Sequence, residues 1–441
     1  MQLTTAFLRV LVFRFDITSK KQDIKMKKTT LLTITASIFM ILGLMLTGCQ
    51  DPIFEAIRED VPPEDATVSG NIRAITRYTA GSNEYLALAA NDGLRYKLKD
   101  DNGHGKWVTY GTPFSLLHYD YDSPDHEGEE ILTVLADSTY LYIISAEYTH
   151  TAIEGLSYPD SINIWAKAIT SEGTKWSEAG AWAKAPNKVG DFDLFPIYIA
   201  AIGGTDFRNS NFRVFQTNSP KKEHRAAFVR TYDSDNKIYK YFKLNGSSEP
   251  VECTTEVEAA LIDPNPSPDA DYKPAALSAV YFNGLKFITS PAATTNETYT
   301  DDATYFYYSN GDSKVIYNDG TTATEAFDSK KVISCLATTA DSILIGHGKA
   351  SSNSPAVGGI NRADLTNGIP ASELGSFSKD SNAKFQITSD NMVLALLNAN
   401  PEKTEVDSAL YVSISFYGYS NNFDNIGLWS YYPERGNWNR E

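Results

Sequence analysis

Two stretches far apart in the chain share one pattern: DSTYLYIIS at residues 137–145 and DSALYVSIS at residues 407–415. Each begins with Asp-Ser, a pair typical of turns, and continues as an apolar run rich in β-branched and aromatic residues, which indicates a buried strand. Each is followed by a strand that ends in a tryptophan, at Trp165 and Trp429, and then by a turn and a second tryptophan, at Trp176 and Trp438. The chain therefore contains a repeated unit of β structure.

Looser copies of this unit occur along the chain from residue 67 onward. Several copies have an apolar strand directly before the turn, so we expect each unit to contain four antiparallel strands. The second strand of each unit is expected near Tyr85, Tyr140, Val214, Leu285, Ile343 and Leu410. Four-stranded antiparallel units that recur in this way are the blades of a β-propeller.

The sequence therefore predicts an all-β protein in which residues 67–441 form a single β-propeller of six blades. Seven blades are the alternative count. A pair of β-sandwiches would also fit short strands with regular turns, but the repeat runs the whole length and no linker divides it. A strand from residues 68–79 is expected to complete the last blade and so to close the ring.

A separate segment precedes this body. Met26-Lys27-Lys28 is followed by an apolar run from Leu31 to Leu46, which has the basic, then apolar, then small-residue order of a secretory signal peptide. The run is shorter than the ~20 apolar residues that a membrane-spanning helix needs. We expect translation to start at Met26, residues 1–25 to be an upstream extension, and residues 26–48 to be the signal peptide.

Leu46-Thr47-Gly48-Cys49, at the end of this run, resembles a bacterial lipobox. The resemblance implies cleavage between Gly48 and Cys49 and lipidation of Cys49, with palmitate-type acyl chains that anchor the protein to a membrane. Residues 49–66 would then be a lipidated tether. Gln50 is compatible with an outer membrane, so the expected location is the outer membrane or the cell surface, or the periplasmic side of the envelope.

The composition limits the partners of the body. The formal net charge is −16, and a surface this acidic repels the phosphate backbone of nucleic acids. We therefore expect no nucleic-acid binding. The expected partners are the membrane, through the lipid on Cys49, and a protein or a glycan.

The chain has no Gly-x-Ser-x-Gly elbow, phosphate-binding P-loop or Gly-x-Gly-x-x-Gly motif. The segment Ser171–Trp176 resembles a degraded Asp-box, the turn of sialidase-like propellers, with Ser171 in place of the aspartate. In those proteins the turn is structural, so the resemblance assigns no catalysis. We predict no catalytic residue and favour a protein that is not an enzyme. An envelope carbohydrate-active hydrolase of sialidase-like type is the alternative.

Metal-ligand patterns are also absent from the sequence. The donor-rich segment His118–Glu127 could hold a calcium ion, but an acidic surface loop explains it better. The segment Asp233–Asn236 is interpreted as a hairpin turn. We expect neither a metal nor a cofactor. Whether Cys253 and Cys335 form a disulfide is left open, since spacing alone cannot show it.

These patterns favour one function over the others: a lipid-anchored propeller of the cell envelope that binds or scaffolds another molecule through loops on a rigid frame. An assembly scaffold, similar to the lipoprotein propeller of the outer-membrane barrel-insertion complex, is one form of this hypothesis. Tyr417 and Tyr419 are the best binding candidates, because they fall in a long loop and outside the repeated aromatic positions.

Overall fold

The computed structural model describes Val68 and residues 72–90, 92–99, 105–117, 128–148, 159–169, 182–195, 213–216, 225–233, 235–236, 238–255, 279–282, 306–310, 314–318, 323–331, 333–348, 358–377, 386–415 and 426–441. Its named elements are all β-strands, which confirms the all-β class. The chain divides into two units at Pro62–Pro63, and every described residue belongs to the second unit. The expected leader and the whole of the expected tether, residues 49–66, therefore lie outside the described residues.

The strands form small antiparallel sheets in which strand order follows chain order, so each sheet is a meander. The first sheet contains β1 (Ile72–Ala80), β2 (Asn83–Ala90), β3 (Gly93–Leu98) and β4 (Val108–Tyr110). The second contains β5 (Gly128–Ala136), β6 (Tyr140–Tyr148), β7 (Ser161–Ala168) and β8 (Ala183–Ala185). The third contains β11 (Arg213–Gln216), β12 (Ala227–Asp233), β13 (Ile238–Asn245) and β14 (Ser248–Glu252).

The remaining sheets continue this pattern. The fourth contains β15 (Ala279–Phe282), β16 (Phe306–Asn310), β17 (Lys314–Asn318) and β18 (Ala323–Asp328). The fifth contains β19 (Ile333–Thr338), β20 (Ser342–Gly348), β21 (Gly358–Thr366), β22 (Ile369–Pro370) and β23 (Gly375–Ser376). The sixth contains β24 (Met392–Asn398), β25 (Leu410–Ser415), β26 (Gly427–Tyr432) and β27 (Asn437–Arg440). A two-stranded ribbon pairs β9 (Lys188–Val189) with β10 (Phe192–Asp193).

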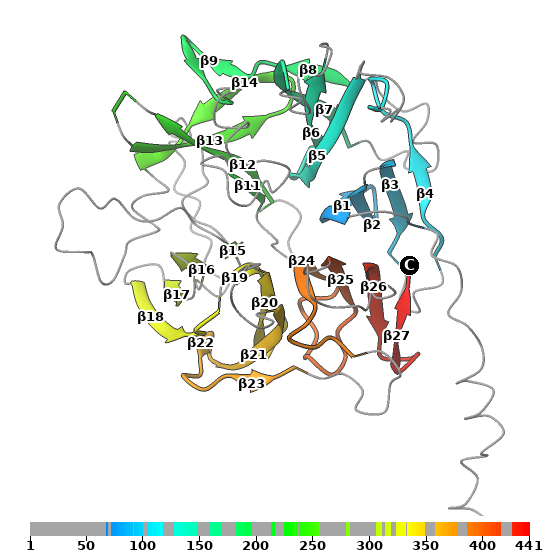
Figure 1. Ribbon diagram of the computed structural model, residues 1–441, viewed down its shortest axis with the longest axis vertical. Coiled ribbons are helices and arrows are strands. Elements are labelled where there is room, and N and C mark those ends of the chain that lie inside the picture. Colours follow the sequence, from blue (N-terminus) through cyan, green and yellow to red (C-terminus); the bar gives the residue numbers. More distant parts are fainter. Residues whose placement is uncertain are drawn as a thin grey trace, which may run out of the picture. The chain divides into compact units, whose positions relative to one another are not determined.

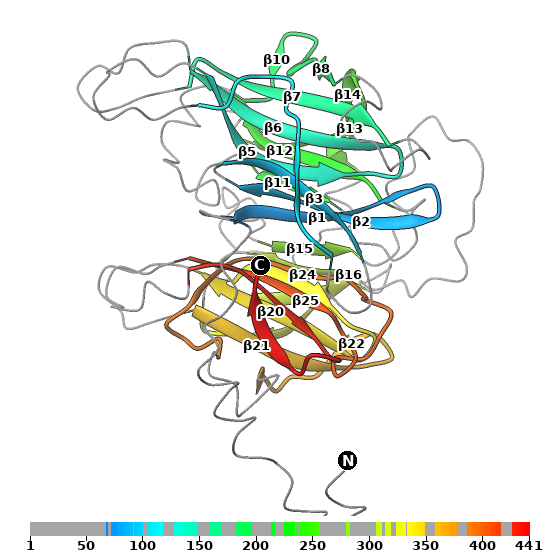
Figure 2. The ribbon, with the colours of Figure 1, turned by 90° about the vertical axis from the view of Figure 1, so that its right-hand side faces the viewer.

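The first strands of the sheets lie innermost (Figure 1). Each contacts the first strand of the next sheet along the chain, from β1 through β5, β11, β15 and β19 to β24, and β24 in turn contacts β1. Figure 2 shows the strands of the second sheet side by side in the turned view. This is a β-propeller arrangement of small antiparallel sheets.

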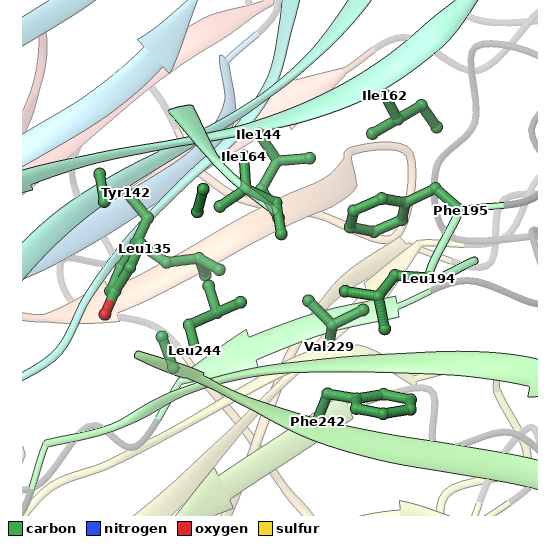
Figure 3. Packing of buried hydrophobic residues seen from close by; sticks show 13 residues of the cluster. Leu135, Tyr142, Ile144, Ile162, Ile164, Leu194, Phe195, Val229, Phe242 and Leu244 are labelled. Carbon is green, nitrogen blue, oxygen red and sulfur yellow. The ribbon is translucent and has the colours of Figure 1, made fainter. Parts of the chain in front are cut away.

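Apolar side chains fill the boundaries between neighbouring sheets. Figure 3 shows one such cluster, in which Ile144 and Ile164 of the second sheet face Val229 and Phe242 of the third. Similar clusters lie between the first and second, fourth and fifth, fifth and sixth, and sixth and first sheets. Both faces of the sheets pack against neighbours, which explains why their strands have continuous apolar runs.

The expected second strands are confirmed in the first, second, fifth and sixth sheets, where β2, β6, β20 and β25 occupy the predicted positions. The third sheet corrects the prediction. Val214 lies in β11, which is the first strand of this sheet, and the second strand is β12. The prediction missed β14, which is short and largely polar. Leu285 lies outside the described residues, and the second strand of the fourth sheet is β16.

The prediction that residues 68–79 complete the last blade is wrong. β1 pairs with β2, and β27 pairs with β26 at the edge of its own sheet. Between the described residues, the backbone hydrogen bond that crosses the boundary between these two sheets is donated by the N–H of Val68 to the carbonyl oxygen of Glu441 at 3.2 Å. Between the described residues, side-chain hydrogen bonds join the first and sixth sheets where the prediction expected a shared strand.

Candidate functional site

Most residues to which the sequence assigns a role lie outside the described residues. These are Gly48 and Cys49 of the lipobox, the binding candidates Tyr417 and Tyr419, the acidic segment His118–Glu127, and the Asp-box-like segment Ser171–Trp176. The described residues therefore do not test these predictions, which remain predictions from the sequence.

The two cysteines of the body are both described. Cys253 is buried directly after β14 in the third sheet, and Cys335 is half-buried in β19 of the fifth sheet. Both are thiols, so they do not form a disulfide with each other. The N–H of Cys253 donates to the carbonyl oxygen of Tyr241 at 2.8 Å, and the Cys253 thiol contacts the same oxygen.

The segment Asp233–Asn236 is a hairpin turn between β12 and β13, as the sequence predicts. The Asp233 carboxylate accepts hydrogen bonds from the Asn236 amide at 2.9 Å and from the backbone N–H groups of Asp235 and Asn236. Together with Lys240, the Asn236 amide and backbone lower the pKa of Asp233 to about 2, although burial opposes them. The carboxylate is therefore used to hold the turn.

The most extensive charged site lies at the end of the first strands, around Glu84 at the start of β2. One Glu84 oxygen accepts from Arg225 Nη2 at 2.7 Å and contacts Arg77 Nε at 3.5 Å. The other oxygen accepts from Lys99 Nζ at 2.6 Å. We call Arg77, Glu84, Lys99 and Arg225 the Glu84 cluster. The Arg77 and Arg225 side chains are almost fully buried, at 5% and 3% exposed.

The Glu84 cluster connects four sheets. Arg225 lies directly before β12 of the third sheet and also donates to Thr79 of β1 at 3.0 Å. Its carbonyl oxygen accepts from the N–H of Ser138, in the β5–β6 turn of the second sheet. Arg77 donates to the carbonyl oxygen of Ala399, directly after β24 of the sixth sheet, at 3.1 Å. The cluster thus binds the turns of separate sheets to one carboxylate.

A neutral contact near the centre adds to this network. The Gln216 side-chain oxygen accepts from Thr76 Oγ1 at 2.7 Å and from the N–H of Ala136 at 2.9 Å. These residues come from β11, β1 and β5, which are three of the innermost strands. The Gln216 side chain therefore joins three innermost strands through hydrogen bonds.

Burial opposes the ionisation of Glu84, but the charge of Arg77 and the hydrogen bonds from Lys99 and Arg225 outweigh it. They hold the pKa of the Glu84 carboxyl below its usual value. Glu84 is therefore ionised at neutral pH and accepts hydrogen bonds. This arrangement suits cross-linking of the sheets, and it does not suit a general acid.

A second polar site lies at the opposite end of the second sheet. Glu129 of β5 and Glu147 of β6 are directly opposite each other in the strand register. The Glu129 carboxylate accepts from the Ser145 hydroxyl and from Trp165 Nε1 at 3.0 Å. We call Glu129 and Glu147 the carboxylate pair. Two acidic side chains placed directly opposite on neighbouring strands repel each other when both are charged, so the pair is a candidate site.

The two members of the pair have different surroundings. Glu147 accepts from the Ser161 hydroxyl at 2.8 Å and from the Asn163 amide at 2.9 Å, and Lys184 Nζ lies 3.7 Å away. The bonds from Asn163 and Ser161 lower the pKa of Glu147. Glu129 is 6% exposed and takes its bonds from neutral groups. Opposite residues on neighbouring strands have Cβ atoms about 5 Å apart, so the two side chains start from neighbouring positions on the sheet.

Two further kinds of site, metal sites and membrane-spanning helices, were searched for among the described residues. Among the residues that the structure describes, no three His, Cys, Asp or Glu side chains come together as metal ligands would. The same residues include no helix with the length and apolarity needed to cross a membrane.

Sequence reasoning missed both the Glu84 cluster and the carboxylate pair. A signal for the first exists only in the tertiary structure, because its members come from positions as far apart as Arg77 and Arg225. The second depends on strand register. A β-bulge between Ile131 and Thr133 shifts the pairing by one residue and places Glu129, in place of Glu130, opposite Glu147.

Comparison with known proteins identifies no family: no family model and no curated protein sequence matches the chain. Several solved structures align with the chain, at low sequence identity and with TM-scores below 0.5. Virginiamycin B lyase from Staphylococcus aureus matches at 12% identity and TM-score 0.32, over 80% of this chain and 95% of that one. A glucose dehydrogenase matches at 11% identity and TM-score 0.36, over 80% of this chain and 96% of that one. An exo-beta-1,3-galactanase from Phanerochaete chrysosporium matches at 8% identity and TM-score 0.34, over 84% of this chain and 76% of that one. Scores this low transfer no activity to this chain.

Proposed function

We propose that this chain is a lipid-anchored protein of the cell envelope whose propeller binds or scaffolds a protein or glycan partner. The anchor is the lipid on Cys49, attached after cleavage at Gly48, and the location is the outer membrane or the cell surface. The body is a ring of six blades, in which each sheet of at least four strands is one blade.

One observation carries the binding role. The charged side chains that converge from separate sheets bond to one another in the Glu84 cluster, so their chemistry is used to hold the frame. Loops carried by a rigid frame are the usual place of recognition in such folds. We therefore assign recognition to the loops between strands, with Tyr417 and Tyr419 as candidates.

Anchoring is tested by Cys49→Ala in the full chain, expressed in a bacterium that processes lipoproteins. We expect the protein to leave the membrane fraction or to accumulate as a larger, unprocessed precursor, and to lose labelling by a palmitate analogue. A matched Cys253→Ala variant should keep the label and the membrane location. Unchanged fractionation, mass and labelling in Cys49→Ala would contradict the anchor.

Binding is tested by mild crosslinking of the anchored protein in whole cells, with Tyr417→Ala/Tyr419→Ala compared against the unchanged chain. We expect a discrete crosslinked species that the double variant loses while its circular dichroism stays the same. A crosslinking pattern without any discrete species, or one that the double variant leaves unchanged, would contradict the assigned role of these tyrosines.

The carboxylate pair favours one second candidate, an envelope carbohydrate-active hydrolase. Retaining glycosidases use two neighbouring carboxyl groups, and Glu147, opposite Glu129 in the strand register, has a lowered pKa, which suits a nucleophile. A panel of chromogenic glycosides decides between the two functions. Turnover that Glu129→Gln and Glu147→Gln each abolish would establish the hydrolase, and equal signals from all three proteins would exclude this site.

A further inference from the structure

The boundary between the sixth and first sheets differs from the others in its connectivity. Every other boundary joins sheets that follow one another along the chain, so a covalent segment links them. This boundary joins the last sheet to the first. Because β1 pairs with β2 and β27 with β26, no strand ladder between described residues crosses it. Non-covalent contacts alone therefore hold the two sheets together.

Glu441 supplies the central contacts at this boundary. Its Oε2 accepts hydrogen bonds from two residues of the first sheet, Lys97 Nζ at 2.8 Å and Trp107 Nε1 at 2.7 Å. Its Oε1 accepts from the Ser430 hydroxyl of β26. Its backbone N–H donates to the carbonyl oxygen of Leu428 at 2.9 Å, which fixes the residue to the sixth sheet.

The ion pair between Lys97 and Glu441 is buried. The Lys97 side chain is 0% exposed and that of Glu441 is 8% exposed. The Lys97 ammonium also lies 5.0 Å from the centre of the Trp107 ring and 4.8 Å from that of Tyr411, which belongs to the sixth sheet. Breaking a buried ion pair by removing one partner is strongly unfavourable, because the other charge stays in an apolar environment.

We propose that Lys97 and Glu441 form a latch that closes the ring. When the latch is broken, the first and last sheets separate locally while the third sheet stays folded. Val68, the first residue that the structure describes, donates its backbone N–H to the carbonyl oxygen of Glu441 at 3.2 Å, so the start of the described body lies beside the latch.

The test is hydrogen–deuterium exchange of the full chain, read by mass spectrometry for each strand, in Glu441→Gln and Lys97→Met. Breaking the latch should raise the opening equilibrium of β1 and β27 by about a hundredfold or more. The amides of β12 and β13 in the third sheet should exchange as before. Lys314→Met, which removes an exposed ion pair with Glu325 at 2.8 Å, is the matched control and should change neither region.

Two further variants keep the test decisive if a single variant folds poorly. Lys97→Met/Glu441→Gln removes both charged side chains of the latch, so β1 and β27 should be better protected than in either single variant. Glu441→Asp should show a smaller increase than Glu441→Gln. Unchanged exchange in β1 and β27, or equal increases in all sheets, would overturn the proposal. These readouts do not depend on lipidation, so failure of the latch and failure of the anchor are distinguishable.

Discussion

Replacing Arg225 with methionine tests the claim that the Glu84 cluster ties separate sheets together. The Arg225 side chain is 3% exposed and makes two charge-assisted contacts, to Glu84 at 2.7 Å and to Thr79 at 3.0 Å. Hydrogen bonds to charged groups contribute about 1.5–3 kcal/mol each. Methionine replaces much of the apolar stem of arginine, so the loss is mainly polar.

Glu84 retains Lys99 and Arg77 in this variant, so its carboxylate is still paired and the two contributions are not lost in full. We therefore expect Arg225→Met to lower the free energy of unfolding by about 2–4 kcal/mol. The assay is urea denaturation followed by tryptophan fluorescence and by far-UV circular dichroism, with the slope of the transition compared between variants.

Lys314→Met is the matched control, because its ion pair with Glu325 has a similar length, 2.8 Å, but lies at the surface with Lys314 45% exposed. An exposed pair of this kind contributes about 0–1 kcal/mol. A loss in Arg225→Met no larger than the loss in Lys314→Met would refute the argument that the cluster holds the frame.

Two further predictions concern pH and backbone packing. Because the folded-state pKa of Glu84 lies below its usual value of 4.5, its contribution is complete above that pH and is lost as the pH falls through the folded pKa. Urea midpoints measured from pH 6 downward should therefore fall less steeply below about 4.5 in Glu84→Gln, and equal slopes would contradict this. Gly358→Ala should destabilise by about 2 kcal/mol or more, because its Cβ would lie 2.0 Å from the carbonyl oxygen of Asn391. Gly111→Ala, with no atom within 4 Å, is the control for the same urea measurement and should be nearly neutral.

Local patterns predicted the fold class and the second strands of four sheets. The turn at Asp137 shows why this works: its carboxylate accepts the N–H groups of Thr139 and Tyr140, both at 2.6 Å, so the turn and the strand after it are encoded by adjacent residues. The prediction for the third sheet missed β14 because this strand has only one buried residue, Pro250, and therefore shows no apolar run. A fourth strand at a sheet edge needs little burial, so its sequence is weakly constrained.

Ring closure could not be predicted from local pattern. The apolar residues of 68–79 correctly predict a strand. They do not predict its partner, which could be β2 in the first sheet or β27 at the edge of the last sheet. The Ser413 hydroxyl donates to the carbonyl oxygen of Ile72 at 2.6 Å, so β1 does contact the last sheet, through a side chain. Its ladder is made with β2 because a two-residue turn at Gly81-Ser82 places β2 beside it at once.

The sequence does carry a signal for the position of Lys97, the lysine of the latch. Lys97 and Lys167 occupy the third strands of consecutive sheets, each followed by a tryptophan directly before the fourth strand, Trp107 and Trp182. Each ammonium lies over that tryptophan and over a tyrosine of the preceding sheet, Tyr411 for Lys97 and Tyr110 for Lys167.

The repetition of this contact bears on function. A lysine that recurs at the same position of successive sheets, buried between aromatic rings, holds one sheet to the next by a cation–π contact. The Glu84 cluster and the latch use charge for the same purpose, on a chain whose net charge is −16. The carboxylate pair is different, because it places two acidic side chains directly opposite each other on neighbouring strands, and it is therefore the place where an enzymatic role should be tested first.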